Sequence, residues 1–229
     1  MRPRARTFPL LLLLLLLLIS FYFSAQQGAA TREPLVINGA SPPKAFLRVP
    51  YRYQLEAKGG ITPFQWKVSS GWLPAGLSLG PDGVVAGTPK EVGEFSFTVT
   101  ATDSGKPPHQ KTQEFTLEVV EPLVAKWSHP PKVDGQRVTG SIKVSNQTGD
   151  DFDLTVIVVA INEIGRATAI GYQRFDLKRS TLDFEIPFSE NLPHGTYQVN
   201  ADAVAEVQAT GTIYRSRLAG GKIVMQQGP

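Results

Sequence analysis

Alternation of apolar and polar residues marks the clearest strand of the chain. Apolar residues stand at every second position from Phe95 to Ala101, and the residue before each of them is polar: Glu94, Ser96, Thr98 and Thr100. Successive side chains of a strand point to opposite faces, so this period of two predicts a strand with one buried face. Turn residues such as Pro81-Asp82-Gly83 separate shorter runs around it. The segment from Leu73 to Ser104 therefore predicts short antiparallel strands joined by tight turns.

The remainder of the chain repeats this pattern. Phe64, Trp66 and Val68 alternate with polar residues, which predicts a strand with Trp66 in the core. The run Leu154–Ala160 is almost continuously apolar and rich in β-branched residues. It predicts either a central strand buried on both faces or a strand that an oligomer interface covers. The last half contains about seven such strands, the number expected for an Ig-like or fibronectin-III-like sandwich.

The order of these turns and strands resembles a known family. The pattern LPAGLSL…DGVVAGTP…VGEFSFTVTATDS lies within residues 34–121 and is similar to the He-PIG family of Ig-like domains, a cadherin-like β-sandwich. This resemblance implies a non-enzymatic extracellular module, mostly of bacterial proteins. No family is recognised for residues 122–229. We predict an all-β protein of two tandem Ig-like antiparallel β-sandwich domains, 31–121 and 122–229, because Pro122 cannot continue a ladder.

The first 25 residues have the character of a secretory signal peptide. Three arginines, at positions 2, 4 and 6, precede an apolar run from Leu10 to Phe23. Small residues follow at Ser24-Ala25 and again at Gly28-Ala29-Ala30, so cleavage as late as residue 30 is the alternative. An uncleaved membrane anchor is the other alternative, and it would be the chain's only contact with a membrane. The predicted location is secreted, periplasmic or at the cell surface.

Charge and cysteine content narrow the function. The chain has 23 basic and 20 acidic residues, and removing the three arginines of the leader leaves 20 of each. Binding to nucleic acid needs an excess of basic residues on one surface, so no nucleic-acid partner is predicted. The sequence contains no cysteine. Disulfides, thiolate metal sites and a cysteine nucleophile are therefore excluded.

No catalytic motif stands out. The three histidines, His109, His129 and His194, lie in segments rich in Pro and Gly, and none is at metal-ligand spacing from another. They are predicted to be solvated loop residues. The chain has no G-x-S-x-G motif. A hydrolase would require Ser, His and acidic side chains from distant segments to converge in a cleft, and the sequence predicts no enzyme.

Calcium is the one metal that the sequence brings into question. Asp103 matches the aspartate that binds calcium in cadherin domains, and Glu121 is a second candidate ligand at the predicted domain boundary. The other acidic motifs of a cadherin site are missing, and calcium needs six to eight oxygen ligands. A calcium-binding module is therefore an alternative, and no other cofactor is predicted.

The predicted function is an interaction or adhesion module whose loops and edge strands meet a protein or polysaccharide of the cell envelope or surface. Trp72 and Trp127 are the candidate contact residues, and they would serve the alternative of a carbohydrate- or cell-wall-binding accessory protein. An exposed edge strand could bind a partner by β-augmentation. Asn146-Gln147-Thr148 fits a glycosylation sequon, which we ascribe to chance because the family resemblance points to bacteria.

Overall fold

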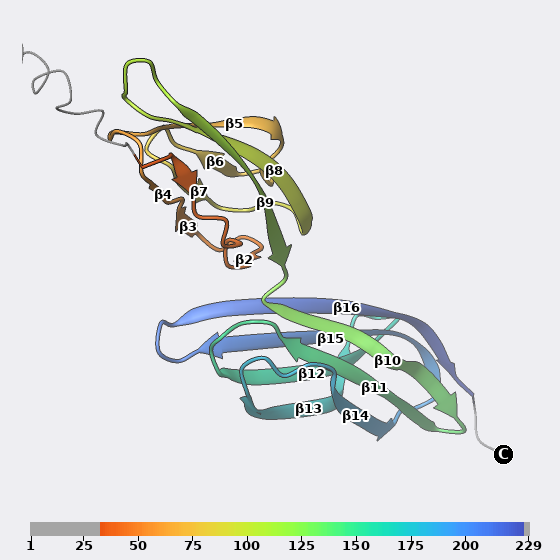
Figure 1. Cartoon of the computed structure of the whole chain (residues 1–229). Helices are drawn as coiled ribbons and strands as arrows, with labels where there is room; N and C mark the ends of the chain where they lie inside the picture. The colour runs from red at the N-terminus through yellow and green to blue at the C-terminus, as the bar shows by residue number, and fades with distance from the viewer. Residues whose placement is uncertain (1–32, 227–229) are drawn as a thin grey trace, which may run out of the picture.

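The computed structural model describes residues 33–226, and these residues form strands and turns with no helix. The predicted all-β class is confirmed. The predicted signal peptide lies outside the described residues. Figure 1 shows two groups of strands, β1–β9 and β10–β16, that meet at the short segment between β9 and β10.

The first group contains three sheets. A four-stranded sheet has the order β2-β9-β8-β5, a three-stranded sheet has the order β3-β7-β6, and β1 pairs with β4. Apart from the parallel pair of β2 and β9, every pairing is antiparallel. The strands are β1 (Val36–Ile37), β2 (Ala45–Phe46), β3 (Tyr51–Gln54), β4 (Ala57–Lys58), β5 (Gln65–Gly71), β6 (Leu77–Leu79), β7 (Val84–Gly87), β8 (Gly93–Thr102) and β9 (Gln110–Val120).

The alternation seen in the sequence fills the core of this group. Phe95, Phe97, Val99 and Ala101 of β8 are all buried, together with Trp66 of β5. Gly83 in the turn before β7 has a φ of +83°, and a Cβ there would lie 2.7 Å from the Trp66 indole nitrogen. The turn therefore needs glycine both for its backbone conformation and for the space that the Trp66 ring occupies.

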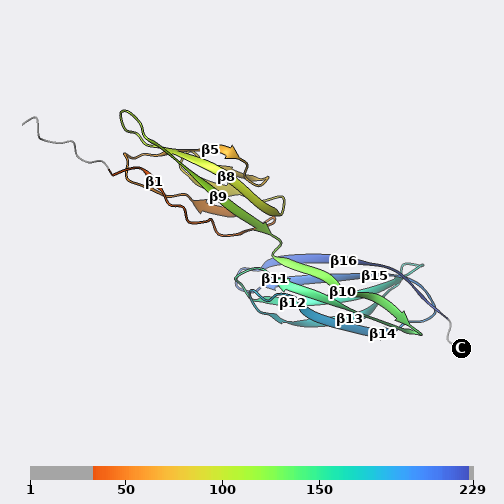
Figure 2. The same ribbon diagram turned by 45° about the vertical axis from the view of Figure 1, so that its right-hand side comes forward.

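The second group consists of two sheets that pack face to face, as Figure 2 shows. One has the order β10-β11-β14 and the other β13-β12-β15-β16, and all their pairings are antiparallel. Seven strands make up the group, as predicted. They are β10 (Leu123–Asp134), β11 (Arg137–Asn146), β12 (Phe152–Asn162), β13 (Ala167–Leu177), β14 (Phe184–Asn191), β15 (Gly195–Val207) and β16 (Thr212–Met225).

The two groups have separate hydrophobic cores. One cluster of buried residues runs from Leu35 to Val119 and the other from Leu123 to Met225, with no member in common. The apolar strand β12 is central in its sheet, and its side chains alternate. Phe152, Leu154, Val156, Val158 and Ala160 are buried, and the residues between them are half-buried on the opposite face. Burial on both faces, one of the two interpretations from the sequence, does not hold within this chain.

Strand β10 continues through the proline-rich segment at His129, which the sequence predicts to be a loop. Pro130 and Pro131 lie inside the strand, where the register shifts around His129. Pairing is with β11 alone, so β10 is an edge strand of its sheet. Proline is tolerated at bulges and edges because the missing N–H faces no ladder partner. His129 is therefore a strand residue, and its prediction as a loop residue was wrong.

Candidate functional site

Asp103, a candidate calcium ligand, is buried at the end of β8 and holds a loop together. Its Oδ1 accepts hydrogen bonds from the backbone N–H groups of His109 (2.7 Å) and Gly105 (3.1 Å). Its Oδ2 accepts one from Ile61 (3.2 Å) and lies 3.3 Å from His109 Nδ1. These bonds hold the pKa of the Asp103 carboxyl below its usual range, and the bond from the His109 backbone N–H contributes most. Both oxygens are therefore engaged with donors that would compete with a cation.

Glu121, the second candidate ligand, is exposed between β9 and β10. Within residues 33–226, no group of three or more His, Asp or Glu side chains is placed to hold a metal ion. Calcium needs several oxygen ligands, usually carboxylates, at one point. The described residues thus give the calcium alternative no geometric support.

The two candidate tryptophans differ in their surroundings. Trp72 follows β5 and is 73% exposed, the most exposed aromatic side chain among the described residues. Trp127 is partly buried against the second core, where its ring packs edge-on to Phe188 at 6.0 Å. Its indole Nε1 donates to the Ala219 carbonyl at 3.0 Å. Trp127 therefore ties β10 to β16, and Trp72 is the better placed of the two to meet a ligand.

Three side chains that the sequence does not connect converge on the β10-β11-β14 sheet. Ser141 of β11 donates a 2.6 Å hydrogen bond to Glu185 Oε1 on β14. His129 Nδ1 lies 2.8 Å from Ser141 Oγ and 3.3 Å from Glu185 Oε1. A shallow pocket that Pro130 and Pro187 help to line opens here. Ser141 is 12 residues from His129 and 44 residues from Glu185, and no local pattern in the sequence indicates that the three side chains meet.

The order of these groups differs from that of a hydrolytic triad. In a triad, histidine stands between the serine and the acid and uses a different nitrogen for each. Here the Ser141 hydroxyl stands between the other two, and a single nitrogen, His129 Nδ1, faces both. The Ser141 hydroxyl is also the main cause that lowers the pKa of the Glu185 carboxyl, which makes it a weaker base. The cluster is built to brace three strands rather than to activate a nucleophile.

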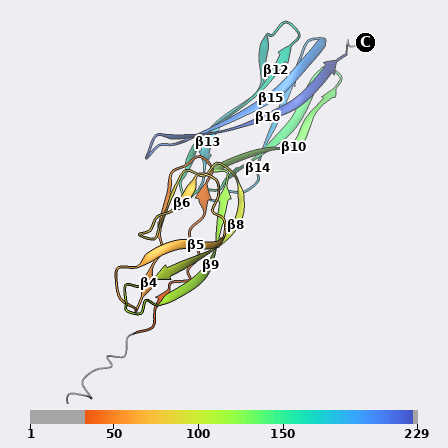
Figure 3. The same ribbon diagram turned by 90° about the horizontal axis from the view of Figure 1, so that it is seen from above.

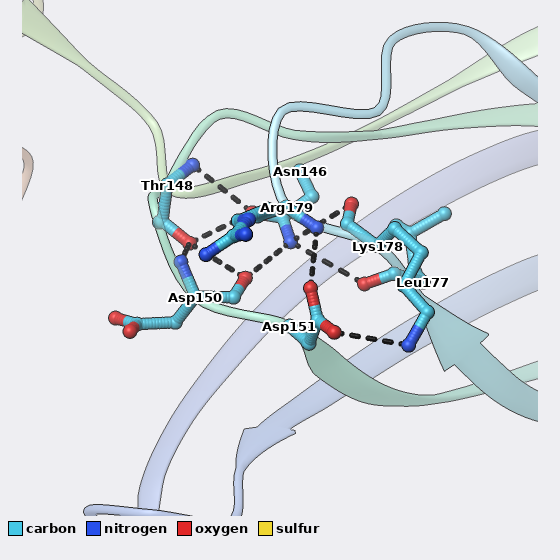
Figure 4. A network of polar contacts seen from close by, with 7 residues as sticks. All are labelled: Asn146, Thr148, Asp150, Asp151, Leu177, Lys178 and Arg179. Atoms are coloured by element: carbon cyan, nitrogen blue, oxygen red, sulfur yellow. Dashed lines mark hydrogen bonds and ion pairs between the residues drawn. The ribbon is translucent and has the colours of Figure 1, made fainter.

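Asn146, the asparagine of the sequon, is fully buried at the end of β11. Figure 4 shows its contacts: Nδ2 donates to the carbonyls of Asp150 (2.7 Å) and Lys178 (3.3 Å). Oδ1 accepts from the Thr148 N–H at 3.0 Å and from the Thr148 hydroxyl at 2.8 Å. The sequon pattern thus has a structural cause, because Asn and Thr two positions apart close a buried turn.

An unpaired sheet edge is the other feature that could bind a partner. Strand β13 pairs with β12 and, within the described residues, with no other strand. In Figures 1 and 2 it lies beside β14, at the side of the sandwich opposite β10 and β16. Tyr172 in the middle of β13 is 62% exposed, and Phe184 of β14 is also exposed. Phe175 projects from the core face of β13, opposite Leu154, and packs on Phe184 of β14 with ring centres 5.0 Å apart.

A family model matches the first group of strands. Residues 33–120 match the model of the He_PIG family, described as "Putative Ig domain", and this part of the chain is a domain of that family, as predicted. No curated protein matches the chain.

Several solved structures are similar at low identity. Protocadherin gammaB7 matches at 14% identity and a TM-score of 0.32, over 83% of this chain and 46% of that one. Drosophila N-cadherin matches at 18% identity and a TM-score of 0.31, over 85% of this chain and 51% of that one. A Salmonella alpha-2-macroglobulin matches at 13% identity and a TM-score of 0.37, over 86% of this chain and 16% of that one. The chain thus spans about half or less of the length of these three structures. No helix among residues 33–226 is long and apolar enough to cross a membrane.

Proposed function

We propose that this protein is a non-enzymatic binding module, and that its partner is a protein of the cell envelope or surface. Ig-like folds present loops and edges on a rigid scaffold, which suits binding rather than chemistry. The observation that carries the proposal is the unpaired edge of β13, with the exposed Tyr172 in the middle of the strand. Export through the N-terminal leader, with cleavage after it, is part of the same proposal.

The physical case for β13 is that an unpaired edge has a row of unused backbone donors and acceptors. A partner strand that adds to it forms main-chain hydrogen bonds and gains affinity from them. Specificity then comes from alternate side chains, and Tyr172 projects outward from β13 opposite Ile157 of β12. An exposed tyrosine beside an apolar residue is a common anchor in protein interfaces.

A photo-crosslinking amino acid at position 172 tests this proposal. We expect Tyr172→p-benzoylphenylalanine, expressed in the native cell, to form a discrete crosslinked product with an envelope protein. The control places the same amino acid at Lys111, an exposed residue of β9 in the first group of strands. Equal products at both positions, or none at position 172, would contradict a binding site at the β13 edge.

Carbohydrate binding is a second candidate function, because the Trp72 ring is 73% exposed. Flat aromatic faces suit contacts with sugar rings, and an exposed tryptophan carries a large apolar area. Binding to a glycan array or to peptidoglycan should then disappear in Trp72→Ala. It should persist in Trp127→Phe, because the Trp127 indole N–H is used within the chain. Binding by neither the unchanged protein nor Trp127→Phe would remove this candidate.

A further inference from the structure

The edge strands of the second group are not equally open. Strands β10 and β16 are neighbours, and Ala125 N of β10 donates to Ser216 Oγ of β16 at 3.2 Å. Strand β14 carries Pro187, which has no N–H to offer to a partner strand. Strand β13 has no proline, and its register with β12 is regular from Gly171 to Leu177. The segment Gly171–Leu177 is therefore the edge best suited to accept another strand.

One carboxylate of this segment, that of Asp176, has no ion pair among the described residues. Asp176 of β13 stands directly opposite Asp153 of β12. Arg174 lies on the same face and donates to both oxygens of Asp153, from Nε at 3.0 Å and from Nη2 at 2.6 Å. Two carboxylates directly across a ladder repel each other, so Asp176 would gain from a cation on its open side.

We propose that this edge binds the same edge of a second copy of this chain. The two β13 strands would pair antiparallel about a two-fold axis at Phe175. This register sets Arg174 opposite the partner's Asp176 and Asp176 opposite the partner's Arg174. A two-fold interface is isologous, so each charge pair occurs twice. The sheets of the two copies then join into one continuous sheet. The inference rests on the proposed binding site at β13 and names its occupant.

The size of the contact predicts how strong the dimer is. Five residues from Gln173 to Leu177 pair in this register and span about 17 Å at the usual rise of a strand. Such an edge contact is smaller than a standard protein interface, so a dissociation constant in the micromolar range is expected. Tyr172 is 62% exposed beside this segment and adds apolar area to the contact.

Sedimentation equilibrium of the mature chain tests the proposal. We expect the average mass to rise from one chain to two between low and high micromolar concentration. Asp176→Lys sets like charges opposite each other and should weaken dimerisation by about tenfold or more. Glu190→Lys is the matched control, since it makes the same charge change at an exposed position of β14 and should leave the dimer unchanged. A single-chain mass at every concentration, or equal weakening by both variants, would overturn the proposal.

Disulfide trapping tests the register, because the chain has no cysteine of its own. Arg174→Cys and Asp176→Cys change exposed residues, so neither disturbs the core. Directly opposite Cβ atoms in antiparallel strands lie close enough for a disulfide. Under mild oxidation, a mixture of the two variants should crosslink, and each variant alone should not. Equal crosslinking in all three samples would overturn the register.

The homodimer and the broader binding function fail in different ways. A crosslink from position 172 to another envelope protein, together with a monomeric mass, would overturn the homodimer and support the proposed function. A crosslink from position 172 to a second copy of this chain would support both. No crosslink and a monomeric mass would overturn both.

Discussion

Replacing the buried Asn146 by alanine is the sharpest test of how the second group is held together. The side chain is fully buried and joins the turn after β11 to the segment after β13 (Figure 4). Asn146→Ala removes the only side-chain acceptor of the Thr148 N–H and the 2.7 Å donor to the Asp150 carbonyl. The Thr148 hydroxyl keeps one partner, because it also donates to the Asp150 carbonyl at 3.3 Å.

The magnitude follows from this count of groups. Three hydrogen bonds of 3.0 Å or shorter are lost. The bonds of Asn146 to the Asp150 carbonyl and to the Thr148 hydroxyl count about 1 kcal/mol each, and the third loss leaves the buried Thr148 N–H unpaired at about 1–3 kcal/mol. The free energy of unfolding should therefore fall by about 3–5 kcal/mol. Asn146→Asp, which keeps the shape, should be at least as harmful, because an oxygen would then face the carbonyls of Asp150 and Lys178.

Urea unfolding followed by tryptophan fluorescence measures this change as a shift of the midpoint at constant slope. Gln147→Ala is the matched control, since its side chain is only half-buried in the same turn and should change stability by no more than about 0.5 kcal/mol. A loss below about 1 kcal/mol in Asn146→Ala would refute the reasoning, because the buried N–H would then have found another partner.

Three further predictions concern single side chains. Backbone donors lower the pKa of the Asp103 carboxyl in the folded state. The ionised carboxylate therefore stabilises the fold fully at pH values above the ordinary carboxyl pKa, and this stabilisation is lost as the pH falls through the lower folded pKa. Unfolding midpoints should therefore drop less between neutral and acid pH in Asp103→Asn than in the unchanged protein, and equal drops would contradict this. Trp66→Ala should cost about 3–5 kcal/mol because the ring is buried, and Trp72→Ala about 0.5 kcal/mol or less because it is exposed, both measured by urea unfolding. Ser141→Ala should raise the Glu185 pKa toward its ordinary value in an NMR titration, because the 2.6 Å hydrogen bond from the Ser141 hydroxyl is the main cause that lowers it. An unchanged pKa would contradict this role of the hydroxyl.

Much of the fold could be predicted because it depends on short-range patterns. The alternation from Phe95 to Ala101 placed one face of β8 in the core, and all four residues are buried. The same period applied to Trp66, which lies in that core. Strand count and turn residues then led to an Ig-like class, since side-chain period and turn chemistry are local properties of the chain.

Edge position and long-range contacts could not be predicted in this way. Strand β10 passes through Pro130 and Pro131 because nothing pairs with its outer side, and only the sheet order decides that. Strands β13 and β14, both labelled in the view from above of Figure 3, belong to different sheets. No local pattern in the sequence places their edges together.

The sequence alone determined which residues alternate, where the chain turns and which charges it carries. The tertiary structure decided which polar residues are buried and what they contact. The sequence indicated only a sequon at Asn146 and singled out nothing at Ser141, yet both residues are buried and hydrogen-bonded to distant segments. The physical reason is that burial of a polar side chain depends on partners brought by other strands, and those partners are separated from it along the chain by tens of residues.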